Sequence, residues 1–144
     1  MSRIKMEFDA ISENEGLARV CVAAFATRLD PTLEEIDDVK TAVSEAVTNS
    51  VIHGYDEKGG IIVLEAEIKE RELLVRVTDY RKGIEDVKKA MEPLFTTGSD
   101  KERSGMGFTF MEVFMDELSV ESVPGQGTVV ILSLIHISEP TRLA

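Results

Sequence analysis

The chain has 144 residues, a length typical of one domain, and 43% of them are hydrophobic, which is enough to build a core. Its formal net charge of −11 argues against nucleic-acid binding, because neutralising phosphates requires a basic surface. No apolar run approaches the ~18 residues that span a bilayer, and the start MSRIKMEFDA lacks the apolar segment of a signal peptide, so we expect a cytoplasmic protein that does not bind membranes.

The first part of the chain predicts a strand and a helix. IKMEFDA alternates apolar and polar residues with a period of two, which indicates a strand. Ser12 and Glu15 have the spacing of a capping box, for a helix that runs to about Leu29. The single cysteine, Cys21, is expected to be a buried structural thiol. We expect the buried side of this helix to carry Leu17, Val20, Ala24 and Phe25.

A second helix follows the breaker DPT. Thr32 is its predicted N-cap, again with a glutamate, Glu35, three residues later. The helix is expected to end near HGY, where Gly54 can take the left-handed conformation. One face at helical spacing is predicted to be buried and consists of Ile36, Val39, Val43, Ala46, Val47 and Ser50.

The rest of the chain predicts strands and two further helices around a long loop. IIVLEAEIKE and ELLVRVTD indicate two strands that turn near Glu70 and Arg71. IEDVKKA indicates a short helix, and MEPLFTTGSDKERSGMG has no period, so we expect a functional loop there. FTFMEVFMDEL indicates a helix, and LSVESV and GTVVILSL indicate two strands joined by PGQG. The core-facing stripe of that helix is predicted to be Phe108, Met111, Met115 and Leu118.

These elements predict an α+β fold: a two-layer sandwich in which helices cover one face of a mixed, mostly antiparallel sheet. We expect a single domain over residues 1–132. Strand alternation fades after Leu132 and SEPTRLA is polar, so residues 133–144 are predicted to be a tail of uncertain origin.

A polar row interrupts the second helix. Glu45, Asn49 and His53 are spaced four residues apart, so the first two lie about 40° from each other around the helix. Such a row is typical of a solvated surface. Asparagine is a poor helix former in mid-helix, however, and this favours the alternative of a ligand pocket.

Asp79 follows the strand that is predicted to end at Thr78, and Gly83 comes four residues later. An aspartate there can accept a hydrogen bond from an exocyclic amine, and a glycine allows a flat base to approach the backbone. Both residues are also common in ordinary turns, which is the alternative.

A glycine-rich segment, SGMG, leads directly into the last predicted helix. Free N–H groups at a helix start bind phosphates, and Arg103 just before the segment can add a charge-assisted contact. A flexible linker with a glycine cap is the alternative.

The order of these features resembles the ATP-binding fold shared by DNA gyrase, ATP-dependent heat-shock chaperones, histidine kinases and MutL. Within that group, SEAVTNSVIHGY, EPLFTT and ERSGMGF resemble the bacterial anti-sigma F factors of sporulation, over about Met6 to Leu132. The resemblance implies a histidine-kinase-type ATPase fold that binds ATP and Mg²⁺. It further implies a homodimer that sequesters a sigma factor and phosphorylates its anti-anti-sigma factor on serine, as a protein serine/threonine kinase.

Carried over to this sequence, the resemblance assigns a role to each candidate residue. Glu45 is the expected general base, Asn49 the Mg²⁺ ligand and Asp79 the contact to the adenine amine, with Gly83 in the same nucleotide loop. Arg103 is expected to stabilise the transferred phosphoryl group. The remaining expected nucleotide contacts are Thr97, Ser104, Gly105 and Gly107.

Two residues near the site keep two interpretations each. His53 lies at the pocket edge in the family, and its alternative is packing or capping the helix end. Arg19 matches a partner-contact region, and its alternative is a solvated side chain.

One departure from the family pattern concerns the Asp-x-Gly-x-Gly loop, which reads DYRKG here. Arg81 takes the first glycine position, where a positive φ or close nucleotide approach would make a side chain costly. The competing hypothesis is therefore an anti-sigma binding module with an impaired pocket and no kinase activity. A detached histidine-kinase catalytic domain is the third hypothesis. The acidic surface suits a basic protein partner or, alternatively, serves solubility.

Overall fold

The computed structural model describes residues 2–54, 60–80, 115–123 and 127–134. Within them, five strands form one sheet in the order β1-β2-β3-β5-β4. All four neighbouring pairs of described strands are antiparallel, so the α+β class is confirmed and the sheet shows no parallel pair in this part. The strands are β1 Ser2–Asp9, β2 Ile61–Lys69, β3 Glu72–Asp79, β4 Glu117–Val123 and β5 Gly127–Leu134.

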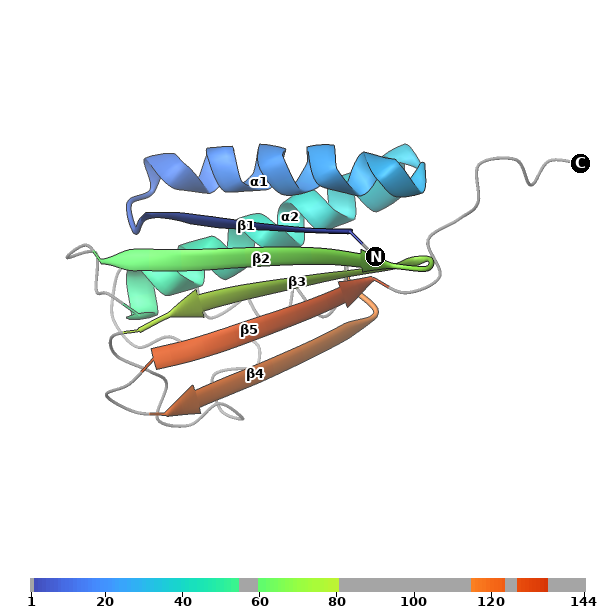
Figure 1. The fold of residues 1–144 in the computed structure, drawn as a ribbon. Helices are drawn as coiled ribbons and strands as arrows, with labels where there is room; N and C mark the ends of the chain where they lie inside the picture. Colours follow the sequence, from blue (N-terminus) through green and yellow to red (C-terminus); the bar gives the residue numbers. More distant parts are fainter. Residues whose placement is uncertain (1, 55–59, 81–114, 124–126, 135–144) are drawn as a thin grey trace, which may run out of the picture.

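The helices form the second layer. α1 spans Glu13–Ala26 and continues into a 3₁₀ turn, η1, at Thr27–Leu29. α2 spans Leu33–Asn49 and continues into a π turn, η2, at Ser50–Gly54. Figure 1 shows α1 and α2 on the same side of the sheet, which is the predicted two-layer arrangement. Neither α1 nor α2 is long and apolar enough to cross a bilayer.

The core lies between the two layers because the strands alternate. On β3 every second residue from Leu73 to Asp79 is buried, and the register pairs Val77 with the buried Leu64 of β2. Burying a valine or leucine side chain contributes about 1.5–3 kcal/mol, so this interface dominates the stability of the fold. The largest fully buried side chains are Ile62, Leu64, Leu73, Leu132, Val22, Val39, Val43, Val47, Val75 and Val77.

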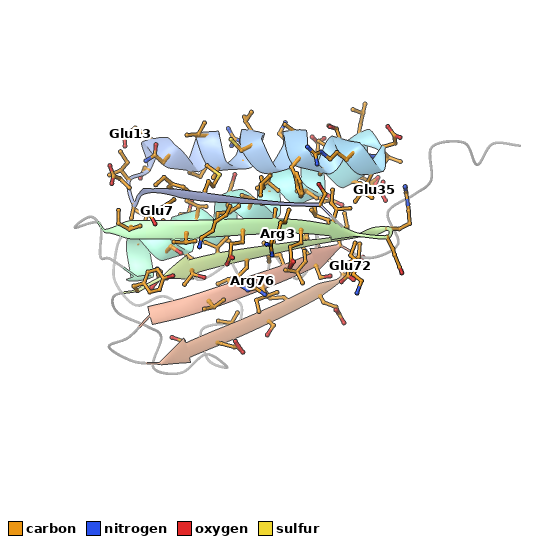
Figure 2. All side chains as sticks on the ribbon, viewed as in Figure 1. Arg3, Glu7, Glu13, Glu35, Glu72 and Arg76 are labelled. Carbon is orange, nitrogen blue, oxygen red and sulfur yellow. The ribbon has the colours of Figure 1, made fainter. Side chains whose placement is uncertain are left out.

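The other face of the sheet carries charged side chains beside apolar ones such as Val63, which pairs with Glu7. Figure 2 shows Arg3, Glu7, Glu72 and Arg76 on the side away from α2. Arg76 forms a cross-strand ion pair with Glu65, with an N–O distance of 3.6 Å. This alternation fixes the strand register, because a slip of one residue would turn charged side chains into the core.

Of the two predicted capping boxes, only the one on α2 forms. The hydroxyl of Thr32 accepts a hydrogen bond from the Glu35 N–H at 3.1 Å, and the Glu35 carboxylate accepts one from the Thr32 N–H at 2.8 Å. The box predicted at Ser12 is wrong: Ser12 already has helical dihedral angles and its side chain makes no capping bond. A cap requires an extended residue, and the carboxylate of Glu15 contacts α2 instead.

The predicted buried side of α1 is also wrong, except for Phe25. Leu17 and Val20 are 52% and 57% exposed, and Ala24 is exposed as well. They lie on a stripe more than about 100° around the helix from the one that faces the core. Cys21 is half-buried. The core stripe consists of Ala18, Val22, Phe25 and Ala26.

The hairpin between β2 and β3 turns at the predicted place. Glu70 takes a positive φ of 57°, and the guanidinium of Arg71 donates to the Leu29 carbonyl at 2.8 Å. This bond ties the hairpin to the turn between the two helices.

β4 begins one residue earlier than expected, whereas β5 spans the predicted segment GTVVILSL. Glu117 and Leu118, assigned by sequence to the end of a helix, belong to β4, where the antiparallel pairing with β5 decides their conformation. Met115 is buried in the core, as predicted. Of the tail predicted over residues 133–144, Ser133 and Leu134 belong to β5, because they pair with β3. Residues 135–144 lie outside the described residues, as do the rest of that helix and the predicted helix IEDVKKA.

Candidate functional site

The polar row of α2 lies at the C-terminal end of the helix, and this end is buried in the fold. Asn49, the last residue of α2, is only 5% exposed, and Glu45, one turn earlier, is half-buried. The neighbouring Ala46 and Val47 are fully buried against the sheet. A solvated surface, the first interpretation of the row, therefore does not describe Asn49, and the pocket interpretation is favoured.

The amide of Asn49 is the unusual group at this end. Among the described residues, neither its nitrogen nor its oxygen has a hydrogen-bond partner, although both atoms are buried. An unsatisfied buried polar group costs about 1–3 kcal/mol, so natural proteins keep one mainly for a purpose. An amide oxygen is a suitable ligand for a hard cation such as Mg²⁺.

The π turn η2 continues α2 directly after Asn49. Its first three residues, Ser50, Val51 and Ile52, are buried, and η2 contacts both β3 and β5. Figure 1 shows α2 ending at the edge of the sheet where β3 ends and β5 begins. π turns inside helices often occur at functional sites. His53 lies in η2, but its side chain is outside the described residues.

Asp79 reaches the same edge from β3. It is the last residue of the strand, on the helix-facing side, and only 4% exposed. Its neighbours across the sheet are Ile62 and Thr128. The fold thus brings two buried polar side chains, Asn49 and Asp79, to one end of the two-layer sandwich.

Gly127, at the start of β5, supports Asp79, and no role was predicted for it. A Cβ on Gly127 would lie 2.2 Å from the Asp79 carbonyl oxygen and 2.8 Å from the Tyr80 Cα, and its φ is +135°. Only glycine fits this close approach of two backbones. The GQG turn signal was visible in the sequence, but the contact with β3 depends on strand pairing and could not be read from it.

Thr128 is a second residue that sequence reasoning missed. It lies opposite Asp79, is 5% exposed, and its hydroxyl is 2.8 Å from that of Ser122 on β4. Ser122 also donates to the Gly127 carbonyl at 3.2 Å. These bonds fix the β4–β5 hairpin beside the Asp79 position.

A polar cluster joins α1 to α2 just before Glu45. The hydroxyl of Ser44 donates to the Glu15 carboxylate at 2.7 Å, and the Arg19 guanidinium lies 3.1 Å from the same carboxylate. Arg19 also donates to the Ser44 hydroxyl at 3.5 Å. The cluster holds α1 against the turn of α2 that carries Glu45. Arg19 therefore has partners within its own chain, Glu15 and Ser44.

The other candidate residues lie outside the described residues and stay predictions. They are Arg81, Gly83, Thr97, Arg103, Ser104, Gly105 and Gly107. Among the described residues no group of three His, Cys, Asp or Glu side chains could hold a metal ion by itself.

Comparisons with known proteins point to one group. Residues 8–134 match the family model described as Histidine kinase-like ATPase domain. The anti-sigma F factor of Clostridium acetobutylicum is 60% identical over 131 residues, which are 91% of this chain and 92% of that protein. The anti-sigma F factor of Thermoanaerobacter pseudethanolicus is 59% identical over 127 residues, covering 88% and 89% of the two chains.

A solved structure supports the fold. The crystal structure of the RsbU and RsbW domains of a Mycobacterium tuberculosis protein matches with a TM-score of 0.70 at 21% sequence identity. The match covers 99% of this chain and 34% of that longer one. At this identity the likeness shows the two-layer architecture alone.

Proposed function

Because the chain belongs to the anti-sigma F factors, within the histidine kinase-like ATPase domain family, we propose that it inhibits a sporulation sigma factor and phosphorylates the anti-anti-sigma factor on serine with Mg-ATP. We further propose that it acts as a homodimer in the cytoplasm. The buried amide of Asn49, which has no hydrogen-bond partner in the part of the chain that the structure describes, is the observation that carries the enzymatic part.

Asn49 would hold Mg²⁺ through its amide oxygen, which fits because the amide is buried and its atoms are not used elsewhere in the described structure. The bound ion would offset charge on the phosphates. Glu45, one turn earlier on α2, would accept the proton of the incoming serine hydroxyl. A half-buried carboxylate suits that role, since it combines access to substrate with partial shielding from water.

Asp79 would bind the exocyclic amine of adenine. Asp79 is buried at the end of β3, so water would not replace a lost hydrogen bond between its carboxylate and the base, and losing that bond would lower the binding free energy. Gly127 and Thr128 would keep the backbone of Asp79 in place. Gly83, Thr97, Arg103, Ser104, Gly105 and Gly107 would complete the site around the phosphates.

The decisive experiment measures phosphate transfer and nucleotide binding separately. Purified wild type, Glu45→Gln and Asn49→Leu are incubated with labelled ATP and the purified anti-anti-sigma factor, and ATP binding is followed by calorimetry. We expect transfer by the wild type, binding without transfer by Glu45→Gln, and weak binding by Asn49→Leu. Wild-type binding of Mg-ATP without Glu45-dependent transfer would contradict the kinase.

The alternative function is an anti-sigma module with an impaired nucleotide pocket. Arg81, in place of a glycine of the family loop, is the observation that favours it. Calorimetry of the wild type and Arg81→Gly separates the two proposals, because only the impaired module would gain ATP affinity on replacement. The histidine-kinase hypothesis has lost support, because the anti-sigma F relatives match at about 60% identity over nearly their whole length.

A further inference from the structure

The proposed cation contact does not use the nitrogen of the Asn49 amide. Holding a cation requires only the amide oxygen, Oδ1. The nitrogen, Nδ2, carries two N–H donors, and among the described residues it has no hydrogen-bond partner, although Asn49 is only 5% exposed. A buried donor without a partner costs about 1–3 kcal/mol, so the nitrogen requires an explanation as much as the oxygen does.

The residue type at this position sharpens the point. A carboxylate has nearly the shape of an amide, and its charge makes it the stronger ligand for Mg²⁺. An aspartate would therefore hold a cation at least as well, and it has no N–H group that burial could leave without a partner. A cation contact by itself thus does not account for an amide. Because Oδ1 and Nδ2 are bonded to the same carbon, their two partners must lie side by side.

The carboxylates at this end of the fold are not the partner of Nδ2. Glu45 lies one turn earlier on α2, and residues four apart on a helix can pair. Asp79 is buried at the same edge of the sheet. In the described part of the chain, the Asn49 nitrogen bonds to neither of them. Its donors are therefore left to a ligand atom that accepts hydrogen bonds and lies beside a cation.

The backbone of α2 does not supply such a donor. The N–H of Ser50 bonds to the carbonyls of Ala46 and Val47 within the helix. The C-terminal end of a helix also carries a partial negative charge, which favours a cation and disfavours an anion. An anion that accompanies the cation here therefore needs a side-chain donor, and Nδ2 of Asn49 is in the position to provide it.

We propose that Asn49 binds the Mg-nucleotide through both ends of its amide: Oδ1 holds the cation, and Nδ2 donates a hydrogen bond to a phosphate oxygen beside it. The inference rests on the proposed function, to which it adds a second contact. Mg²⁺ in kinase sites is shared between protein oxygens and substrate phosphates, so an acceptor is available next to the cation. Asn49 thus selects the complex of metal and nucleotide, since either component by itself leaves one end of the buried amide unsatisfied.

Asn49→Asp tests the nitrogen without removing the oxygen ligand. The variant keeps the shape of the side chain and replaces two donors by an acceptor. Calorimetry at pH 8, well above the ordinary pKa of an aspartate, compares Mg-ATP binding by the full-length wild type and the variant. We expect the dissociation constant of the variant to rise about tenfold or more, because a charge-assisted hydrogen bond is lost and two negative groups meet. A contact to the cation only predicts an equal or lower dissociation constant.

Asn14→Asp is the matched control. Asn14 lies in the first turn of α1, where its Nδ2 donates to the Asp9 carbonyl at 2.9 Å in an exposed position. The same exchange adds the same charge to the chain, outside the polar row of α2. We expect Mg-ATP affinity to stay within about twofold of the wild type. Thermal unfolding without nucleotide shows whether each variant is folded.

A measurement on the wild type does not depend on the folding of any variant. The sequence contains three side-chain amides, Asn14, Asn49 and Gln126, so their NH₂ signals in a nitrogen–hydrogen correlation NMR spectrum are few enough to assign. On addition of Mg-ATP, we expect one NH₂ proton of Asn49 to move downfield and to show coupling to phosphorus through the hydrogen bond. The signals of Asn14 should not change.

The outcomes separate this inference from the proposed function. Mg-ATP binding by Asn49→Asp as tight as that of the wild type would overturn the inference and leave the cation contact standing. An Asn49 NH₂ signal that saturating Mg-ATP does not move would overturn it as well. A wild type that binds no Mg-ATP would overturn the nucleotide-dependent function together with the inference. A wild type that shows the expected binding but transfers no phosphate would overturn the kinase and support the two-ended contact.

Discussion

The two ends of α2 are built in opposite ways. At its start, Thr32 and Glu35 satisfy each other's backbone N–H groups in a complete capping box. At its end, Asn49 is buried with an amide that finds no hydrogen-bond partner among the described residues, and the helix passes into a π turn. The first end follows the rules for a stable helix, and the second end breaks two of them.

This difference indicates that the end of α2 at Asn49 is less stable than it could be, as expected for a functional site. A capping box contributes about 1 kcal/mol, whereas an unsatisfied buried amide costs about as much or more. Local rules are broken mainly where function requires it. We therefore expect substitutions at the two ends to separate into those that change stability and those that change activity.

Gly127→Ala should have the largest effect, because the added methyl group would collide with the β3 backbone at Asp79, beside the candidate site. The added Cβ would lie 2.2 Å from the Asp79 carbonyl oxygen in a conformation that favours glycine. We expect the free energy of unfolding to fall by about 4 kcal/mol. Urea unfolding measures this change.

Gly16→Ala is the matched control for that variant. Gly16 lies inside α1, and its Cβ would meet only the Arg19 guanidinium at an ordinary 3.6 Å. Alanine should raise the free energy of unfolding there by about 0.5–1 kcal/mol. Similar destabilisation by both substitutions would contradict the close backbone approach at Gly127.

Asn49→Leu should abolish function while preserving the fold. Removing the metal ligand is expected to lower phosphate transfer by about 100-fold or more, on the scale of a lost electrostatic contact at an active site. The free energy of unfolding in the absence of nucleotide should hold or rise, because a buried polar group without a partner is replaced by an apolar one. A marked loss of stability would instead indicate that the amide has a structural role.

Thr32→Ala should show the reverse at the other end of the helix. Losing the cap is expected to lower the free energy of unfolding by about 1 kcal/mol. ATP affinity, measured by calorimetry below the unfolding temperature, should not change. A Thr32→Ser variant, which keeps the hydroxyl, should recover most of the stability.

Asp38→Asn is expected to have the smallest effect, and it depends on pH. Partial burial, with the carboxylates of Glu34, Asp37 and Glu35, raises the pKa of Asp38 above its ordinary value. The folded protein therefore binds this proton more tightly than the unfolded chain, so the ionised carboxylate destabilises the fold as the pH rises through that raised pKa.

The amide variant should accordingly stabilise the protein at pH 7 by less than about 0.5 kcal/mol, since the group is near the surface. Near pH 3 the carboxyl group is mostly protonated in both states, and the gain should disappear. Urea titrations at the two pH values would show this difference, and an equal gain at both would contradict the assigned cause.

The sequence predicted features that depend on local chemistry. Thr32 and Glu35 formed the expected box because both residues lie in one turn of the chain. The strands from Ile61 and Glu72 followed from alternation and a turn signal. The polar row at Glu45 and Asn49 followed from helical periodicity, which places residues four apart on one side.

Features that depend on tertiary contacts were missed. Ser12 has the same local pattern as Thr32, yet the carboxylate of Glu15 bonds Ser44 of α2 and pairs with Arg19 one turn later on α1. Leu17 and Val20 carry the apolar signature of a core, but the sheet covers a different stripe of α1. Gly127 required knowledge of the strand beside it.

The π turn after Asn49 has a consequence for insertions and deletions. A π turn is an α turn with one additional residue, so losing one residue within Ser50–Gly54 would restore regular helix geometry and leave the preceding helix in register. Losing one residue between Thr32 and Glu45 would instead rotate everything after it by about 100° and swing the asparagine out of the interior. Length variation among natural relatives should therefore be tolerated after the asparagine and rejected before it.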